Sequence, residues 1–241
     1  MFFGINILYG QTTETKRTYY KNADGNIVSE KTIDSTMSAL TSKMSKLGMI
    51  AYKDFKNKIE KGDSIIYEFR IHVLDSASLD NFIKEKEHKK KIIGKPLPNF
   101  VLKDINDKTL KFEDFKGKPM VINLWFTSCL PCILEIPELN RLKELPEYSG
   151  IIFLAITFET KEKVKKFLKK KEFNFTHIVN AREYCEYFTS AYPVNIFVDK
   201  NGIVTNLEGG MPLVVEKDKK PDLKNSKVDS KSFVYELNKI K

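Results

Sequence analysis

The chain has 241 residues, of which 41% are hydrophobic and 30% are charged, which is enough for one large domain or two small domains with hydrophobic cores. The net charge of +9 comes almost entirely from lysine. The sequence lacks the arginine forks interleaved with aromatic residues that read phosphates and bases, so we do not expect a nucleic-acid-binding protein. Diffuse lysine is more typical of a solvated surface, while attraction to acidic partners or membrane surfaces stays open.

Residues 1–10 are apolar and end on a glycine before the polar run that begins at Gln11. This pattern is typical of the last part of a secretory signal, so we interpret residues 1–10 as a signal-peptide remnant whose start lies further upstream. A frayed apolar N-terminus on a cytoplasmic protein is the alternative. No later run approaches the roughly 18 uninterrupted apolar residues of a membrane-spanning helix, so we expect no transmembrane span.

Residues 11–74 are predicted to form a small α+β domain. Apolar residues at positions 33, 37, 40, 44 and 47 recur with helical spacing, between a start signal at Ser29 and a stop at Gly48. A strand then begins at Ile50, and residues 65–73 alternate between apolar and polar as in a half-buried strand. This part of the sequence shows no catalytic constellation, so its function stays open.

Residues 75–92 are predicted to connect this domain to the next. Asp75 and the serines after it can cap a short helix that carries Leu79, Phe82 and Ile83. Residues 84–91 are nearly all charged, which is typical of a solvated helix or linker. We assign this segment no function.

Residues 93–241 alternate between strand-like and helix-like patterns. The expected elements are buried strands beginning near Val121 and at Ile151, a helix over residues 161–171, a hairpin centred on Asn201-Gly202, and a last helix with Phe233, Leu237 and Ile240 on one stripe. Such an alternation predicts an α/β fold with a mixed central sheet and helices on both of its faces.

One stretch combines a buried strand with two cysteines. The apolar run that starts at Val121 breaks at Thr127-Ser128 and restarts as a helix whose first turn carries Cys129 and Cys132. A sulfur at a helix start lies where backbone N–H groups and the helix dipole favour negative charge, so the Cys129 thiolate is stabilised. A second, buried sulfur can then attack a mixed disulfide formed at the first. The spacing therefore predicts a thiol–disulfide exchange site.

A Cys-x-x-Cys pair is also half of many zinc sites, and it can form an inert structural disulfide. A zinc site needs about four ligands, and the remaining candidates are Cys185 and three histidines at positions 72, 88 and 177, with no typical spacing. A disulfide that closes so short a loop gains little stability. We therefore favour a redox-active pair and expect no metal and no cofactor besides that disulfide.

Several motifs in residues 93–241 occur together in one known family. They are Trp125 ahead of Cys129-Leu-Pro-Cys132, Glu135-x-Pro137 behind it, Tyr192-Pro193, and the hairpin Val198-Asp-Lys-Asn-Gly202. This half of the chain resembles the thioredoxin fold, and more closely the TlpA/ResA-like thiol–disulfide oxidoreductases of the thioredoxin and AhpC/TSA superfamily. The resemblance implies a cis peptide bond before Pro193, packed against the redox pair, and a substrate backbone bound by its neighbours.

The sequence departs from the family pattern at three positions. Ser128 stands where a tryptophan commonly precedes the nucleophile, and Asn123 replaces the buried acid of cytoplasmic thioredoxins. Tyr192 stands where a smaller residue commonly precedes the cis-proline, so we expect a narrower substrate groove. The first 90 residues lie outside the resemblance.

The catalytic roles follow from the helix start and from the resemblance. Cys129 is the predicted attacking nucleophile, and Cys132 is the predicted resolving thiol. The family uses the residue that matches Glu135 as an acid or base near the thiols. A surface charge near a helix start is the alternative for this glutamate.

The substrate side of the site is assigned to Tyr192, Pro193 and Trp125. Trp125 and Phe126 are expected to pack in the core and in the wall of the site. Cys185 is expected to be a small buried hydrophobic residue, with a regulatory third thiol as the alternative.

We therefore predict an enzyme, an extracytoplasmic or periplasmic thiol–disulfide oxidoreductase that reduces protein disulfides. Protein thiols and disulfides are the expected substrates, and an upstream thiol–disulfide reductant is the expected partner. A peroxiredoxin-like thiol peroxidase is one alternative, although Phe126 and Ile122 stand where its motif has Thr and Pro. A non-catalytic thioredoxin-fold binding module is the other.

Overall fold

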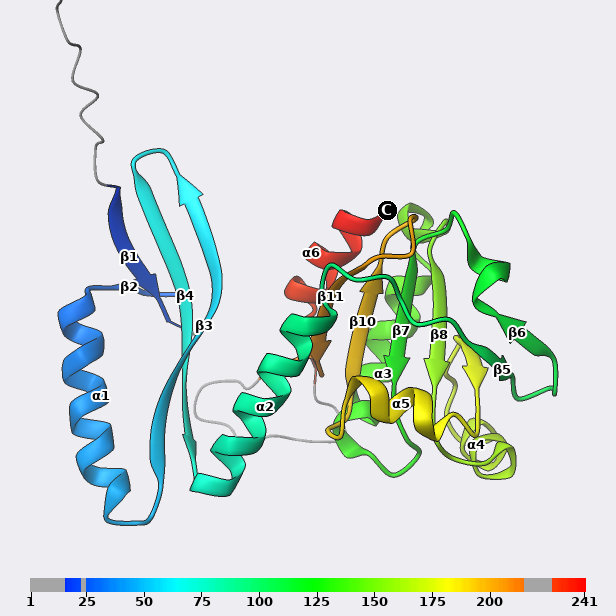
Figure 1. The fold of residues 1–241 in the computed structure, drawn as a ribbon, viewed down its shortest axis with the longest axis horizontal. Helices are drawn as coiled ribbons and strands as arrows, with labels where there is room; N and C mark the ends of the chain where they lie inside the picture. The colour runs from blue at the N-terminus through cyan, green and yellow to red at the C-terminus, as the bar shows by residue number, and fades with distance from the viewer. Residues whose placement is uncertain (1–15, 23–24, 215–226) are drawn as a thin grey trace, which may run out of the picture. The chain divides into compact units, whose positions relative to one another are not determined.

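The structure is a computed structural model that describes residues 16–22, 25–214 and 227–241. The chain divides into two compact units, Met1–Lys84 and Glu85–Lys241, and each unit is drawn in Figure 1. The predicted signal remnant at residues 1–10 lies outside the described residues. No helix among the described residues is long and apolar enough to cross a membrane.

The N-terminal unit is built on a four-stranded sheet with the order β2-β1-β4-β3. Its strands are β1 (Arg17–Lys21), β2 (Ile27–Val28), β3 (Ile50–Lys61) and β4 (Ser64–Leu74). The last two form a long antiparallel hairpin. Gly62 in its turn has a φ of 57°, a left-handed conformation that costs glycine little. β1 pairs with β4 in parallel.

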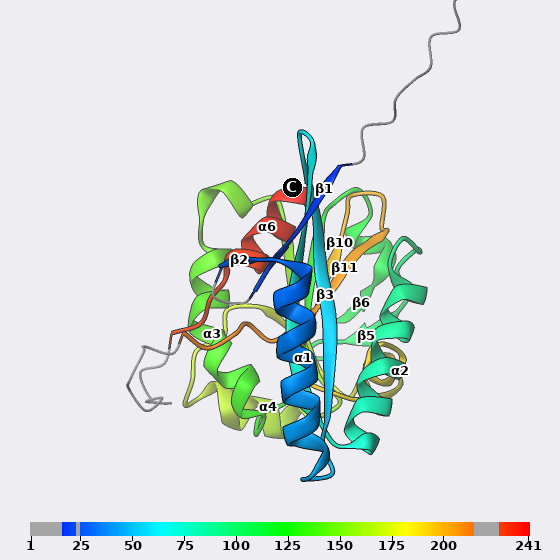
Figure 2. The same cartoon turned by 90° about the vertical axis from the view of Figure 1, so that its left-hand side faces the viewer.

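Helix α1 (Glu30–Ser45) lies against this sheet (Figures 1 and 2). Its start is confirmed, because the Ser29 side chain accepts a hydrogen bond from the Thr32 N–H, which satisfies one of the unpaired donors of the first turn. Ile33 is buried with Tyr20 and Phe69. Leu47 was expected on the buried stripe, but it is 70% exposed because the helix ends two residues before it.

Helix α2 (Ser76–Ile92) is one continuous helix of 17 residues. Asp75 caps it as predicted, since its carboxylate accepts a hydrogen bond from the Ser78 N–H at 2.8 Å. Of the two alternatives for the charged run at residues 84–91, the helix is confirmed and the linker is wrong. The run continues one longer helix to the buried Ile92, so the helix that Asp75 caps is not short. The division between the two compact units falls inside α2.

The second unit has a five-stranded mixed sheet with the order β11-β10-β7-β8-β9. The strands are β7 (Met120–Leu124), β8 (Ile152–Ile156), β9 (Thr176–Ile178), β10 (Val194–Val198) and β11 (Val204–Gly209). The first three of these run in parallel, whereas β10 is antiparallel to both of its neighbours. A small hairpin of β5 (Val101–Lys103) and β6 (Thr109–Lys111) and two short 3-10 turns complete the unit.

Helices cover both faces of this sheet, as the predicted fold class requires (Figure 1). The helices α3 (Leu130–Lys143), α4 (Lys161–Leu168) and α6 (Lys231–Ile240) pack on one face. The other face is covered by α5 (Arg182–Phe188) and by the buried end of α2. Side chains of β7 alternate between the two cores, because successive residues of a strand point to opposite faces. The fold is a thioredoxin-like α/β fold.

Candidate active site

The two cysteines lie where α3 begins, directly after the central strand β7. Cys129 is the N-cap residue, and its sulfur accepts a hydrogen bond from the Cys132 N–H at 3.2 Å. The two sulfurs form a disulfide, and the Cα atoms are 5.3 Å apart. Cys129 is 5% exposed and Cys132 is 2% exposed. Pro131 occupies the first turn, where its missing N–H leaves no bond unmade.

Glu135 lies on α3, one turn beyond Cys132, and is fully buried at 0% exposure. Its carboxylate accepts hydrogen bonds from Asn123 Nδ2 at 2.8 Å and from the Met211 N–H at 3.0 Å. Burial raises the pKa of this carboxyl to about 7, and the hydrogen bonds only partly offset that effect. The alternative of a surface charge is therefore wrong. Asn123 stands in place of the buried acid of cytoplasmic thioredoxins. Its side-chain amide donates a hydrogen bond to a buried acid on α3, Glu135.

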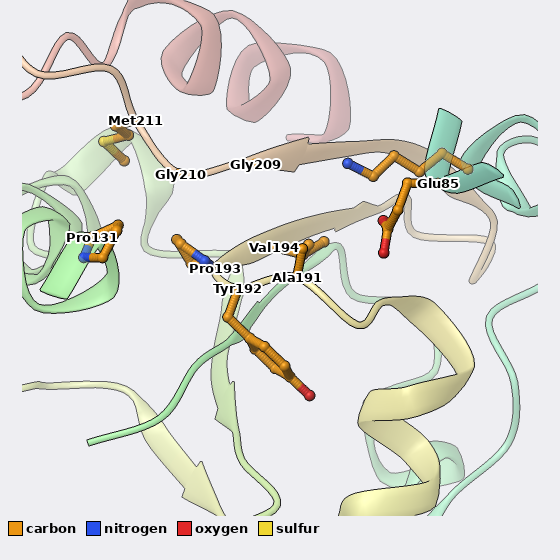
Figure 3. Close-up of a pocket in the computed structure, with 10 residues that line it drawn as sticks. Glu85, Pro131, Ala191, Tyr192, Pro193, Val194, Gly209, Gly210 and Met211 are labelled. Carbon is orange, nitrogen blue, oxygen red and sulfur yellow. The ribbon is translucent and has the colours of Figure 1, made fainter. Parts of the chain in front are cut away.

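The peptide bond between Tyr192 and Pro193 is cis, which confirms that expectation. Both residues line a cavity of about 340 Å³. Pro131 of the cysteine motif lines the same cavity. The segment Tyr192-Pro193 therefore lies next to the start of α3 (Figure 3). Gly210 completes this wall, because a Cβ atom there would lie 2.8 Å from Pro193 Cγ. Only glycine fits without a shift of the proline ring.

Three aromatic rings pack together beside the cysteine motif. The Tyr192 ring contacts Phe126 edge-on with centroids 5.5 Å apart, and it contacts Phe158 at 5.6 Å. The rings of Phe126 and Phe158 are 5.7 Å apart. Such edge-to-face clusters hold their members in a fixed geometry. Phe126 therefore supports the cavity wall by packing against the lining residue Tyr192.

The family whose model matches this chain is described as the AhpC/TSA family, over residues 93–207. The thiol-disulfide oxidoreductase ResA of a Bacillus cereus strain is 33% identical over 126 residues, which cover 51% of this chain and 72% of that protein. ResA of Geobacillus thermodenitrificans is 30% identical over 133 residues, or 54% of this chain and 75% of that protein. The chain belongs to the ResA family of thiol–disulfide oxidoreductases.

Solved structures with a similar backbone fold include a putative thiol:disulfide interchange protein DsbE from Chlorobium tepidum. The match has a TM-score of 0.49 and 19% identity, and it covers 61% of this chain and 96% of that one. A putative thioredoxin from Neisseria meningitidis matches with a TM-score of 0.46 and 24% identity, over 60% of this chain and 88% of that one.

The ResA-like site does not use Trp125 in the way that we predicted for the substrate side. Its side chain is fully buried at 0% exposure and packs against Phe167, Phe173 and His177, with ring centroids 5.1 to 5.6 Å apart. A side chain with no exposed surface cannot contact a client, so the assignment to substrate binding is wrong. The expectation of core packing is confirmed.

Cys185 is also buried, on α5, as predicted for a small hydrophobic residue. Burial raises the pKa of its thiol to about 12, although the nearby Tyr192 hydroxyl counteracts the rise. A thiol that stays protonated at neutral pH is a poor nucleophile. The regulatory alternative therefore has no support from this geometry.

Glu159 is a residue of the ResA-like site that the sequence analysis missed. Its buried carboxylate accepts a hydrogen bond from the Thr127 N–H at 2.6 Å, and Lys163 Nζ lies 2.5 Å from it. The hydrogen bonds from Thr127 hold the loop that leads from β7 to Cys129. A signal was present, because Glu159 follows the carboxyl end of a buried parallel strand, where functional side chains of α/β sheets collect.

Proposed function

We propose that this ResA-like enzyme works outside the cytoplasm as a reductase of protein disulfides, with Cys129 as nucleophile and Cys132 as resolving thiol. One observation carries the proposal. The Cys129 sulfur caps α3 and accepts the Cys132 N–H, and Pro131 in the same first turn lines a cavity together with Pro193. A sulfur that already accepts a backbone hydrogen bond at a helix start is favoured as a thiolate once the disulfide is reduced.

The first chemical step is attack by the Cys129 thiolate on one sulfur of a client disulfide. A new S–S bond forms between Cys129 and the client while the client S–S bond breaks, and the leaving client thiolate takes a proton from water. The client segment lies beside Tyr192 and Pro193 in this proposal. The aromatic contacts of Tyr192 support a fixed wall against which that segment is held.

The second step releases the client and oxidises the enzyme. Cys132 loses its proton and attacks the Cys129 sulfur, so the enzyme disulfide forms and the second client thiolate leaves. Glu135 is suited to take the Cys132 proton, because it is one turn away on the same helix and its pKa of about 7 lies near the working pH. An upstream dithiol then returns two electrons and two protons to the pair.

An insulin assay tests the exchange reaction. The reduced protein, recycled with dithiothreitol, should reduce insulin disulfides, whereas a scaffold with no catalytic role should not. Hydrogen peroxide, offered to the same sample, should be consumed no faster than by dithiothreitol alone. Rapid peroxide turnover without insulin reduction would favour the peroxiredoxin-like alternative.

Whether the cysteine pair reduces or oxidises its clients needs a separate measurement, that of its reduction potential. A pair that reduces protein disulfides should have a reduction potential below about −200 mV, nearer thioredoxin than the oxidant DsbA. Equilibration with glutathione buffers of stated ratio, read by alkylation of free thiols, gives the value. A potential near about −120 mV would contradict a reductase.

The location outside the cytoplasm is supported by the apolar segment at residues 1–10 and the polar run after it. N-terminal sequencing of the mature protein from fractionated cells tests it. Recovery outside the cytoplasmic fraction, with an N-terminus near Gln11, is the expected result. Recovery from the cytoplasm with residues 1–10 intact would contradict it.

A further inference from the structure

The second half of α2 belongs to the catalytic unit. That compact unit begins at Glu85, whereas the family match begins at residue 93. Ile92 is buried in the core beneath the sheet. His88 Nε2 donates a hydrogen bond to the carbonyl oxygen of Tyr187, 2.6 Å away. This helical segment is therefore an addition in front of the family domain, and it is packed onto that domain.

Glu85 uses its side chain to hold the loop between α5 and β10. One carboxylate oxygen accepts hydrogen bonds from the Ser190 N–H at 3.1 Å and from the Ser190 hydroxyl at 3.0 Å. The Thr189 hydroxyl lies 3.2 Å from the same oxygen. Hydrogen bonds to an ionised acceptor are stronger than neutral ones. The Thr189 hydroxyl also lies 2.8 Å from the Ala191 carbonyl oxygen, to which its one proton is donated. Glu85 therefore binds this loop through the N–H and the hydroxyl of Ser190.

The loop that Glu85 holds leads directly into Tyr192 and Pro193. Residues 189–193 belong to no helix or strand, and the hydrogen bonds to the Glu85 side chain are among the contacts that fix their position. Ala191, Tyr192 and Pro193 all line the cavity, and Glu85 lines it from the side that α2 supplies (Figure 3). A misplacement of about 1 Å in a substrate-positioning segment can cost a large factor in rate.

We propose that Glu85 is a positioning residue that fixes the client-binding loop 189–193, so that α2 sets the affinity for protein clients. This inference rests on the proposed function in one respect, namely that the client segment binds beside Pro193. Glu85 does not touch the reacting sulfurs, so it acts through Ser190. A small disulfide that reaches Cys129 without docking along the loop has little need of it.

The test compares two substrates, insulin and hydroxyethyl disulfide, across variants of the full chain. Glu85→Ala removes the acceptor, and alanine keeps the helix stable. We expect the ratio of kcat/KM for insulin to kcat/KM for hydroxyethyl disulfide to fall about tenfold, mostly through a higher KM for insulin. Glu85→Gln keeps one acceptor oxygen and should recover part of the loss.

Two further variants give the matched controls. Glu87→Ala removes an exposed carboxylate of the same helix, whose 2.7 Å ion pair with Lys90 stays within α2, and should leave the ratio as in the wild type. Ser190→Ala removes one partner from the loop side and should lower the ratio by a smaller factor. Combined with Glu85→Ala, it should add less than its separate effect, because both changes break the same contact.

An unchanged ratio in Glu85→Ala, with Ser190→Ala also unchanged, would overturn the inference and leave the proposed function intact. If Glu85→Ala does not fold, the Ser190→Ala and Glu85→Gln ratios decide in the same way. A wild-type protein that reduces hydroxyethyl disulfide but never insulin would contradict the proposed protein clients, and the inference with them.

Discussion

The two units use similar elements but bury very different amounts of apolar surface. Among the described residues of the N-terminal unit, the buried apolar side chains are those of Tyr20, Ile33 and Phe69. The catalytic unit has a large apolar cluster on each face of its sheet. Both cysteines of the redox pair and the buried Glu135 belong to this second unit. A rigid, well-filled core therefore lies beneath the chemistry, and a small core supports the unit to which we assign no reaction.

The largest expected effect is confined to the catalytic unit and separates two of its three cysteines, Cys129 and Cys185. Cys129→Ser should abolish insulin reduction, because serine at neutral pH supplies no comparable nucleophile. Cys185→Ala should keep most of the activity, since that thiol is buried on α5. Initial rates of insulin reduction measure both. A Cys129→Ser protein that keeps more than about a tenth of the wild-type rate would contradict the assignment, since activated nucleophiles contribute far more than tenfold.

Core truncations should separate the stabilities of the two units. Leu139→Ala opens a cavity in the larger core and should cost about 4 kcal/mol, whereas Ile33→Ala in the smaller core should cost about 2 kcal/mol. The single tryptophan, Trp125, reports on the catalytic unit alone. Urea titrations followed by its fluorescence should shift with Leu139→Ala only, while circular dichroism should detect both variants. Equal shifts of the fluorescence midpoint would mean that the two units unfold together.

The buried Glu135 should make the catalytic unit less stable as the pH rises. Its folded-state pKa of about 7 lies above the ordinary value near 4.5, so the folded state binds the proton more tightly. Stability is therefore full below about pH 4.5 and falls as the pH rises toward 7, by at most on the order of 3 kcal/mol. Glu135→Gln should remove this loss.

The control residue for Glu135 is Glu138, which lies on the same helix, α3. The Arg141 guanidinium holds the pKa of the Glu138 carboxyl below its usual range, so Glu138→Gln should not change the slope between pH 5 and 7. Urea unfolding of the oxidised proteins, read by Trp125 fluorescence, gives the stability at each pH. A wild-type slope equal to that of Glu135→Gln would show that Glu135 is ionised throughout this range.

The smallest expected effects come from one helix cap in each unit. The Ser29 side chain caps α1, and the Thr160 side chain caps α4 by accepting from the Lys163 N–H. Replacement of either by alanine should cost about 1 kcal/mol. Thr160→Ala should shift the fluorescence transition, and Ser29→Ala only the transition seen by circular dichroism. The reverse pattern would show that the unit boundary lies elsewhere.

Local patterns in the sequence predicted most of the elements. The Cys-x-x-Cys helix start, the cap at Ser29 and the hairpin at Gly202 depend on neighbouring residues, and each is confirmed. The error at Trp125 was avoidable, because Val121 and Trp125 both pack into the core on the α3 side, as strand alternation predicts. We assigned Trp125 to substrate binding because it lies near the cysteines in the sequence, and that assignment was wrong.

Contacts between distant parts of the chain could not be predicted in the same way. The hydrogen bonds from Ser190 to Glu85 join residues 105 positions apart, and those from Met211 to Glu135 join residues 76 apart. The periodicity of apolar residues does not predict such pairs, because they depend on how the sheet brings distant loops together. The charged run in α2 therefore gave no sign that one of its residues binds the loop before Pro193.

The most direct test of the exchange mechanism is to trap its intermediate. The reduced Cys132→Ser protein, mixed with insulin, should form a covalent adduct that dithiothreitol releases, and mass spectrometry of its peptides should place the new disulfide on Cys129. The account predicts this adduct because the resolving thiol is gone while the nucleophile remains. An adduct on Cys185, or no adduct under conditions in which the wild type reduces insulin, would contradict it.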